Sequence, residues 1–209
     1  MTPPDLIVIT DDALSDEEME SRATRILASV PPGSTALQLR DRRRPGRALV
    51  ALAERLHAVC ARYRAPLVVN DRLDIARAVD AEGVHLGTRS VDIADARRLF
   101  GAGIFLSIAA HEVGDVETAA RGGATAALVA PIFATPGKGA ARGPQLVVDA
   151  RRSAANVLLY ALGGIDVERV MACTSAGAFG VAAIRSVWME PGGAFAARAM
   201  VDAVRASRR

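Results

Sequence analysis

Side chains able to hold a phosphate group occur where an apolar run gives way to glycine. Residues 126–143 begin with small and β-branched residues and continue as a glycine-rich loop that carries Thr135 and Lys138. Lys138 is the only lysine among 26 basic residues. A lysine ammonium is compact and acts as a point charge on a phosphate, whereas a guanidinium needs a site that fits its planar fork. This loop is therefore predicted to bind an anion. The alternative is that the single lysine falls here by chance.

A second group of cations follows another apolar run. Arg40 and Arg42 flank Asp41, so in an extended segment both arginine side chains point to the same side. Two guanidiniums on one side can clamp a diphosphate. The alternative is a solvated basic loop, and this is the interpretation we adopt for Arg43 and Arg44.

An amide and an acid, Asn70 and Asp71, end a third apolar run. Such oxygen donors suit Mg²⁺ or ligand hydrogen bonds, while helix capping is the alternative role for Asp71. His85 lies in a fourth run and faces either a ligand or ordinary packing. We expect His57 to lie on a helix surface.

Glycines follow the seventh apolar run, and a basic residue ends the eighth. Gly163 and Gly164 allow backbone N–H groups to approach an anion, and the segment 183–185 brings Ile184 and Arg185 to the next strand end. The alternative is a pair of ordinary turn glycines. Together with Lys138, these residues favour a phosphate site.

These residues follow eight apolar runs that alternate with helical patterns. The expected strands are residues 6–10, 36–40, 66–70, 83–86, 104–108, 126–130, 157–161 and 180–184. The expected helices begin at a Ser15–Glu18 capping box, near residue 45 and near residue 73, and then cover 92–99, 113–121, 145–152, 167–175 and 194–205. Strands that are apolar along their length are buried on both faces, as in a parallel sheet covered by helices.

Eight such units predict an α/β fold of the closed (β/α)8 TIM-barrel type, with one domain over residues 1–209. A doubly wound open sheet is the alternative. In a barrel the functional residues lie at the carboxyl ends of the strands. We therefore expect the polar groups described above to share one mouth.

The amino-acid composition indicates which classes of molecule the protein binds. The chain is 51% hydrophobic and only 4% aromatic, with a net charge of +3, and its arginines are scattered among acids. This pattern favours small anionic ligands and argues against nucleic acid. Cys60 and Cys173, within expected helices, indicate buried thiols in a reducing compartment. We recognise neither a signal peptide nor a membrane-spanning run, so the expectation is a cytoplasmic, soluble protein.

Six segments together carry a family resemblance: QLRDR at 38–42, VVNDRLDIA at 68–76, GVHLG at 83–87, APIFATPGK at 130–138, ALGGI at 161–165 and GVAAI at 180–184. In this order and spacing the chain resembles the thiamine phosphate synthase and thiazole tautomerase superfamily. The resemblance covers nearly the whole chain. It implies a barrel enzyme, possible pairing into a homodimer, and two small phosphorylated substrates.

The resemblance implies a reaction that joins an aminopyrimidine methyl diphosphate to a thiazole phosphate and releases diphosphate. Carried over residue by residue, it assigns the diphosphate to Arg40, Arg42, Asn70 and Lys138, and Mg²⁺ to Asp71. Gln38 would lie against the pyrimidine. The residues that would receive the thiazole phosphate are Thr135, Gly163, Gly164, Ile184 and Arg185.

The chain departs from the synthase pattern at several of these positions. Ser90 stands where a second magnesium aspartate is expected, Ala109 stands where a serine is expected, and Arg42 replaces a lysine. Pro131 replaces the histidine of the tautomerase branch, which leaves His85 or His111 as that branch's acid or base. The alternatives to a synthase are therefore a tautomerase-like isomerase and a phosphate-binding barrel that has lost its metal and its catalysis.

Overall fold

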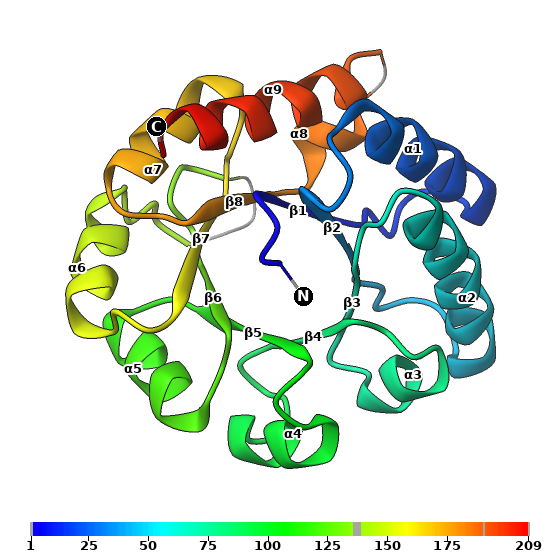
Figure 1. The fold of residues 1–209 in the computed structure, drawn as a ribbon, viewed down its shortest axis with the longest axis horizontal. Coiled ribbons are helices and arrows are strands. Elements are labelled where there is room, and N and C mark those ends of the chain that lie inside the picture. The colour runs from blue at the N-terminus through cyan, green and yellow to red at the C-terminus, as the bar shows by residue number, and fades with distance from the viewer. Residues whose placement is uncertain (1, 136–138, 190, 209) are drawn as a thin grey trace.

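The fold is a closed ring of eight parallel strands in the order β1 to β8, surrounded by helices (Figure 1). The computed structural model describes residues 2–135, 139–189 and 191–208. β8 pairs with β1 and closes the ring, so the predicted (β/α)8 barrel is confirmed and the open sheet is excluded. The strands are β1 (Leu6–Ile9), β2 (Thr35–Leu39), β3 (Leu67–Asn70), β4 (Gly83–Leu86), β5 (Phe105–Ala110), β6 (Ala126–Val129), β7 (Leu158–Leu162) and β8 (Gly180–Ala183).

The helices occupy the outer ring and largely match the expected ranges. They are α1 (Asp16–Ser29), α2 (Gly46–Arg62), α3 (Leu73–Ala78), α4 (Ile93–Phe100), α5 (Val113–Gly122), α6 (Gln145–Ser153), η1 (Val167–Arg169), α7 (Val170–Ser175), α8 (Arg185–Trp188) and α9 (Gly193–Ala206). The Ser15–Glu18 capping box is present at the start of α1. The helix expected over 167–175 is divided into η1 and α7. Among the described residues, no helix is long and apolar enough to cross a membrane.

Alternate residues of each strand face the two sides of the ring. On β1, Leu6 and Val8 pack in the large cluster against the helices, whereas Ile7 and Ile9 pack in a smaller cluster inside the barrel. The same period of two recurs around the ring. Both faces are buried, which explains why the strands are apolar along their whole length.

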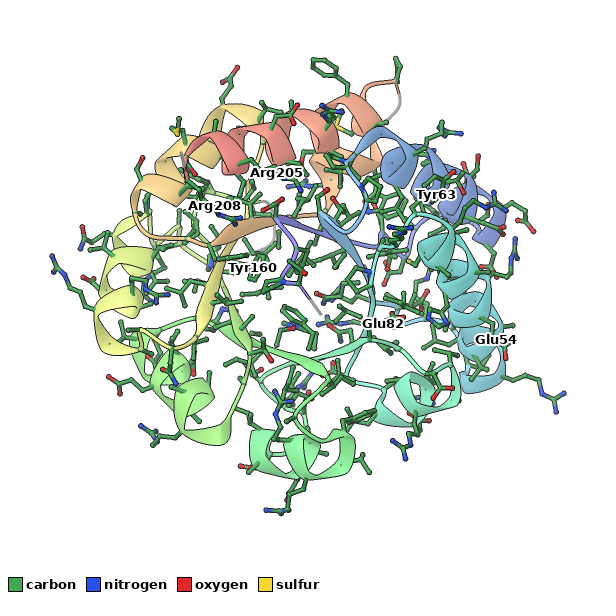
Figure 2. The ribbon with its side chains drawn as sticks, in the orientation of Figure 1. Glu54, Tyr63, Glu82, Tyr160, Arg205 and Arg208 are labelled. Atoms are coloured by element: carbon green, nitrogen blue, oxygen red, sulfur yellow. The ribbon has the colours of Figure 1, made fainter. Side chains whose placement is uncertain are left out.

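The amino end of the barrel is closed by side chains and by the N-terminal segment (Figure 2). Tyr160 reaches inward from β7, and its hydroxyl donates to the Pro4 carbonyl at 2.7 Å. The carboxylate of Asp5 accepts hydrogen bonds from Arg205 at 2.7 Å and Arg208 at 2.6 Å, which joins the two ends of the chain. At the opposite end of the strands, Asn70 and Ile184 are partly exposed. The carboxyl end is therefore the accessible mouth.

Two polar side chains, His85 and Ser107, lie inside the barrel and contact each other. His85 on β4 is 6% exposed, and its Nδ1 lies 3.0 Å from the hydroxyl of Ser107 on β5, which is fully buried. Burial, with a smaller contribution from the charge of Arg40, lowers the pKa of His85 to about 4 even though Asp71 opposes the shift. The imidazole is thus neutral at pH 7. His57, by contrast, lies on α2, where it is partly exposed and contacts Glu82 at 3.0 Å.

We expect His85 to make stability dependent on pH in the acid range. Between about 6.5, the pKa of an unfolded histidine, and about 4, the unfolded chain binds a proton that the folded chain does not. The free energy of unfolding should therefore decrease as the pH falls through this window, by a total on the order of 3 kcal/mol, and be independent of His85 above it. Urea denaturation of the wild type and of His85→Gln across the window measures the difference. Parallel pH profiles would contradict the assignment.

Candidate active site

Arg40 directly follows β2, and its backbone is hydrogen-bonded to Thr10, the residue after β1. Thr10 Oγ1 accepts a hydrogen bond from the Arg40 N–H at 2.9 Å and donates to the Arg40 carbonyl at 3.0 Å. Burial is the main cause that lowers the pKa of Arg40, and the charge of Arg42 adds to it, while Asp12 and Asp71 oppose the shift. The guanidinium remains charged at neutral pH because arginine is one of the strongest bases among protein side chains. Arg40 is therefore a partly desolvated cation whose field extends to Asp71.

The loop after β2 is organised by Asp41, and the expectation that Arg44 is solvated is wrong. The Asp41 carboxylate is fully buried, and its Oδ1 accepts from the N–H groups of Arg43 at 2.7 Å and Arg44 at 2.9 Å. The Arg44 guanidinium bridges Asp41 and Asp16, so its side chain is only 17% exposed. Asp16 comes from a distant helix, and the sequence pattern therefore did not reveal this ion pair. Arg43 is exposed, as expected.

A chain of hydrogen bonds connects β2, β3 and the loop after β4. Gln38 Nε2 donates to Asn70 Oδ1 at 3.2 Å, and Asn70 Nδ2 donates to Asp71 Oδ2 at 2.7 Å. Gln38 is 1% exposed, and its Oε1 has no hydrogen-bond partner among the described residues. A buried acceptor without a partner is costly. This oxygen is thus available to a donor on a bound molecule.

The Asp71 carboxylate is held across the mouth rather than capping a helix. Its backbone is left-handed, with φ +60°, and its Oδ1 accepts from the Gly87 N–H at 2.9 Å and from the Ser90 hydroxyl. Burial raises the pKa of Asp71, but the hydrogen bonds from Ser90, Gly87 and Asn70 hold it below its ordinary value, and His85 adds to this lowering in acid, where its imidazole is protonated. Ser90 therefore keeps the carboxylate ionised and oriented.

The donors available for a divalent cation are few. Within residues 2–135, 139–189 and 191–208, no group of three His, Cys, Asp or Glu side chains could hold a metal ion. Asp71 Oδ2 accepts one bond, from Asn70, and Asp71 is exposed. Mg²⁺ in phosphoryl sites commonly uses one or two carboxylates with substrate oxygens and water. The donor set fits a cation shared with a ligand.

The Gly163–Gly164 turn lies against the loop after β6. Both glycines have positive φ, +100° and +62°. A Cβ on Gly163 would lie 2.9 Å from Pro131 Cα, and one on Gly164 would lie 2.9 Å from the Ala134 carbonyl oxygen. The two loops therefore pack backbone to backbone, which explains the need for glycine. Thr135 is close to this contact, since its hydroxyl donates to the Phe133 carbonyl at 3.1 Å.

Four predicted site residues remain: Ile184 and Arg185 at the end of β8, Arg42 in the loop after β2, and Lys138. Ile184 is partly exposed and Arg185 is exposed at the start of α8. Arg42 is also exposed, and its charge acts on Arg40. Lys138 lies outside the described residues.

Sequence analysis missed the contacts that hold α8 and the turn in place. Ser186 Oγ donates to the Ile165 carbonyl at 2.8 Å, and Trp188 Nε1 donates to the Ile9 carbonyl at 2.6 Å. Arg169 donates to the Gly164 carbonyl. Most of these partners are far apart in sequence, and no local pattern identifies them.

The fold and the polar mouth define a (β/α)8-barrel enzyme. A sequence model described as thiamine monophosphate synthase matches residues 6–187, and the chain belongs to this family. It is 36% identical to the thiamine-phosphate synthase of Roseiflexus castenholzii over 198 residues, covering 93% of this chain and 86% of that protein. It is 35% identical to the thiamine-phosphate synthase of Methanoculleus marisnigri over 207 residues, covering 98% and 97%.

A solved structure agrees with the sequence relatives. The thiamine phosphate pyrophosphorylase of Pyrococcus furiosus superimposes with a TM-score of 0.83 at 25% identity, covering 97% of this chain and 96% of that chain. The resemblance stated from the sequence motifs is thereby confirmed at the level of family and fold.

The role of Ser90 can be tested through the pKa of its partner. Ser90→Ala removes a hydrogen bond to the ionised Asp71 carboxylate, so the pKa of Asp71 should rise. A carboxyl-carbon NMR titration measures it. Ser29→Ala, which removes a hydroxyl bonded to carbonyls of α1 and α9, is the control and should leave the Asp71 titration unchanged. An unchanged value in Ser90→Ala would contradict this account.

The turn can be tested by adding one methyl group. Gly164→Ala places a side chain at φ +62° and against the Ala134 carbonyl, so the free energy of unfolding should fall by about 1–3 kcal/mol. The control is Gly103→Ala, whose Cβ would meet no atom within 4 Å and should have little effect. Chemical denaturation compares the two variants. Equal stability of both would show that the packing of the turn is loose.

Proposed function

We propose that this protein is a thiamine-phosphate synthase, which joins an aminopyrimidine methyl diphosphate to a thiazole phosphate and releases diphosphate. One observation carries the proposal: in a chain matched by the family over residues 6–187, one barrel mouth carries both the Arg40–Asp71 charge cluster and the Gly163–Gly164 turn. The charge cluster suits a diphosphate, and the glycine turn suits a monophosphate. The reaction needs one site for each.

The diphosphate is assigned to the cations that follow β2 and β6 in the sequence, Arg40, Arg42 and Lys138. Arg40 is partly buried, and its charge acts more strongly on a ligand there than it would in water. Arg42 and Lys138 add positive charge, and Asn70 offers amide hydrogen bonds. Positive charge here stabilises the charge that accumulates on the departing diphosphate, and electrostatic stabilisation of this kind is a main source of rate enhancement in such sites.

Mg²⁺ is assigned to Asp71 as the single protein carboxylate. The hydrogen bonds from Ser90 and Gly87 occupy Oδ1, whereas Oδ2 accepts only from Asn70 and keeps a lone pair for a cation. Oxygens of the diphosphate would complete the coordination of that cation. When bound, the ion would neutralise charge on the leaving group. Ser90 orients Asp71 from the position where the family resemblance leads us to expect a second acid.

The pyrimidine is assigned to the interior of the barrel mouth, beside Gln38. The unpartnered Oε1 of Gln38 is a buried acceptor, and an amino group on the pyrimidine supplies the matching donor. Asn70 fixes the orientation of the glutamine amide by accepting from its Nε2. The pyrimidine ring would lie at the polar end of a barrel interior whose other side chains are mostly apolar.

The thiazole phosphate is assigned to the turn after β7 and to the end of β8. Backbone N–H groups near Gly163, Gly164 and Ile184 donate to its oxygens, and Thr135 and Arg185 contribute a hydroxyl and a positive charge. The carbon–oxygen bond between the methylene and the diphosphate breaks, and its electron pair leaves with the diphosphate. The lone pair of the thiazole nitrogen then forms the new carbon–nitrogen bond. No proton has to be transferred.

The reaction tests the proposal directly. Wild-type protein supplied with both precursors and Mg²⁺ should form thiamine phosphate, and chromatography with fluorescence detection measures it. Arg40→Met should lower kcat by about a hundredfold or more, because it removes a charge that stabilises the leaving group. Lys138→Ala should also lower kcat.

The control is Arg62→Met, an exposed arginine in the last turn of α2, which should retain wild-type activity. If the wild type forms no thiamine phosphate and binds the thiazole phosphate unchanged, the synthase proposal fails and a binding role replaces it.

A further inference from the structure

One guanidinium contacts two separate loops of the mouth. Arg169 ends the short helix η1, which follows the Gly163–Gly164 turn. Its Nη1 donates to the Gly164 carbonyl at 2.6 Å, and its Cζ lies 4.9 Å from the centroid of the Phe133 ring. Arg169 therefore touches the loop after β7 and the loop after β6 at the same time.

The two loops are also joined through their backbones. The N–H of Ile132 donates to the Leu162 carbonyl at 2.9 Å, and the N–H of Phe133 donates to the Gly163 carbonyl at 3.0 Å. These bonds extend the pairing of β6 with β7 beyond the strands themselves. A displacement of the turn would therefore also displace Phe133.

The Gly164 carbonyl sets the direction of the next N–H group. In a trans peptide the C=O and the following N–H point in opposite directions. Because Arg169 holds the Gly164 carbonyl, the Ile165 N–H points away from the guanidinium. Within the described part of the chain, neither the Gly164 N–H nor the Ile165 N–H donates to a protein acceptor. Unpaired N–H groups in such a turn are ready donors to an anion.

The Arg169 side chain is itself held in place. Asp166 Oδ2 lies 3.4 Å from Arg169 Nη1, and Asp166 Oδ1 accepts from the Arg169 N–H at 3.1 Å. Both side chains are 45% exposed, and an ion pair at this exposure contributes little by itself. Arg169 instead stabilises the mouth through its charge-assisted hydrogen bond to the Gly164 carbonyl and its contact with the Phe133 ring.

We propose that Arg169 is a positioning residue that aligns the Gly163–Gly164 turn with the Phe133–Thr135 segment so that both bind one phosphate group. Thr135 belongs to this unit because its hydroxyl donates to the Phe133 carbonyl at 3.1 Å. Arg169 acts through the turn and does not contact the ligand. The assignment of that phosphate to the thiazole substrate rests on the proposed function.

The variants are Arg169→Met, which removes the charge and the hydrogen bond, and Arg169→Lys, which keeps the charge. Arg198→Met is the matched control, because Arg198 is a similarly exposed arginine paired with Asp202 on α9. We expect Arg169→Met to raise KM for the thiazole phosphate about tenfold, with kcat and KM for the pyrimidine diphosphate nearly unchanged. Arg169→Lys should recover part of the loss, and Arg198→Met should behave as the wild type.

A binding measurement separates this inference from the proposed function. Calorimetric titration with inorganic phosphate should show weaker binding to Arg169→Met than to the wild type or Arg198→Met, whether or not thiamine phosphate is formed. An active wild type whose Arg169→Met variant keeps both its KM and its phosphate affinity would overturn the inference and leave the synthase intact. Absence of phosphate binding by the wild type, or an equal change in both KM values, would also overturn it. Circular dichroism of each variant checks folding, and Arg169→Lys serves if Arg169→Met is unfolded.

Discussion

Closure of the strand ring between β8 and β1 is the constraint on which the rest of the structure depends. The pairing of Val8 with Ala183 brings the last strand beside the first and directs all eight carboxyl ends to one mouth. No single loop contains enough polar groups to bind two phosphorylated ligands. The ring gathers Arg40, Asp71 and Gly164 from loops that are far apart in sequence.

The two ends of the barrel use polar groups differently. At the amino end, Asp5 and Tyr160 have protein partners for their polar atoms, and the contacts join the two ends of the chain. At the carboxyl end, the buried Gln38 Oε1 and the N–H groups of Gly164 and Ile165 have no hydrogen-bond partner among the residues that the structure describes. Buried polar groups without partners cost free energy, so a protein keeps them where a ligand completes their hydrogen bonds. This asymmetry distinguishes the functional end from the structural end.

Two serines, Ser90 and Ser107, each form a hydrogen bond with a titratable side chain of the barrel. Ser90 offers a hydroxyl to Asp71 where a second carboxylate would instead repel it, so a single ionised acid is retained in a fixed orientation. Ser107 pairs with His85 deeper inside the barrel and keeps a neutral imidazole satisfied. The Ser90–Asp71 and Ser107–His85 hydrogen bonds thus satisfy an ionised acid at the mouth and a buried histidine below it.

The sequence by itself determined the barrel and the family, and it predicted which strand ends carry polar side chains. Apolar runs and helix patterns are local signals, and a parallel barrel places every strand end on the same side. Only the tertiary structure decided which polar groups pair. Arg44 joins Asp16 from α1, and Arg169 joins Phe133 to Gly164, because such contacts depend on the distance between loops in space. Local residue patterns carry no information about that distance.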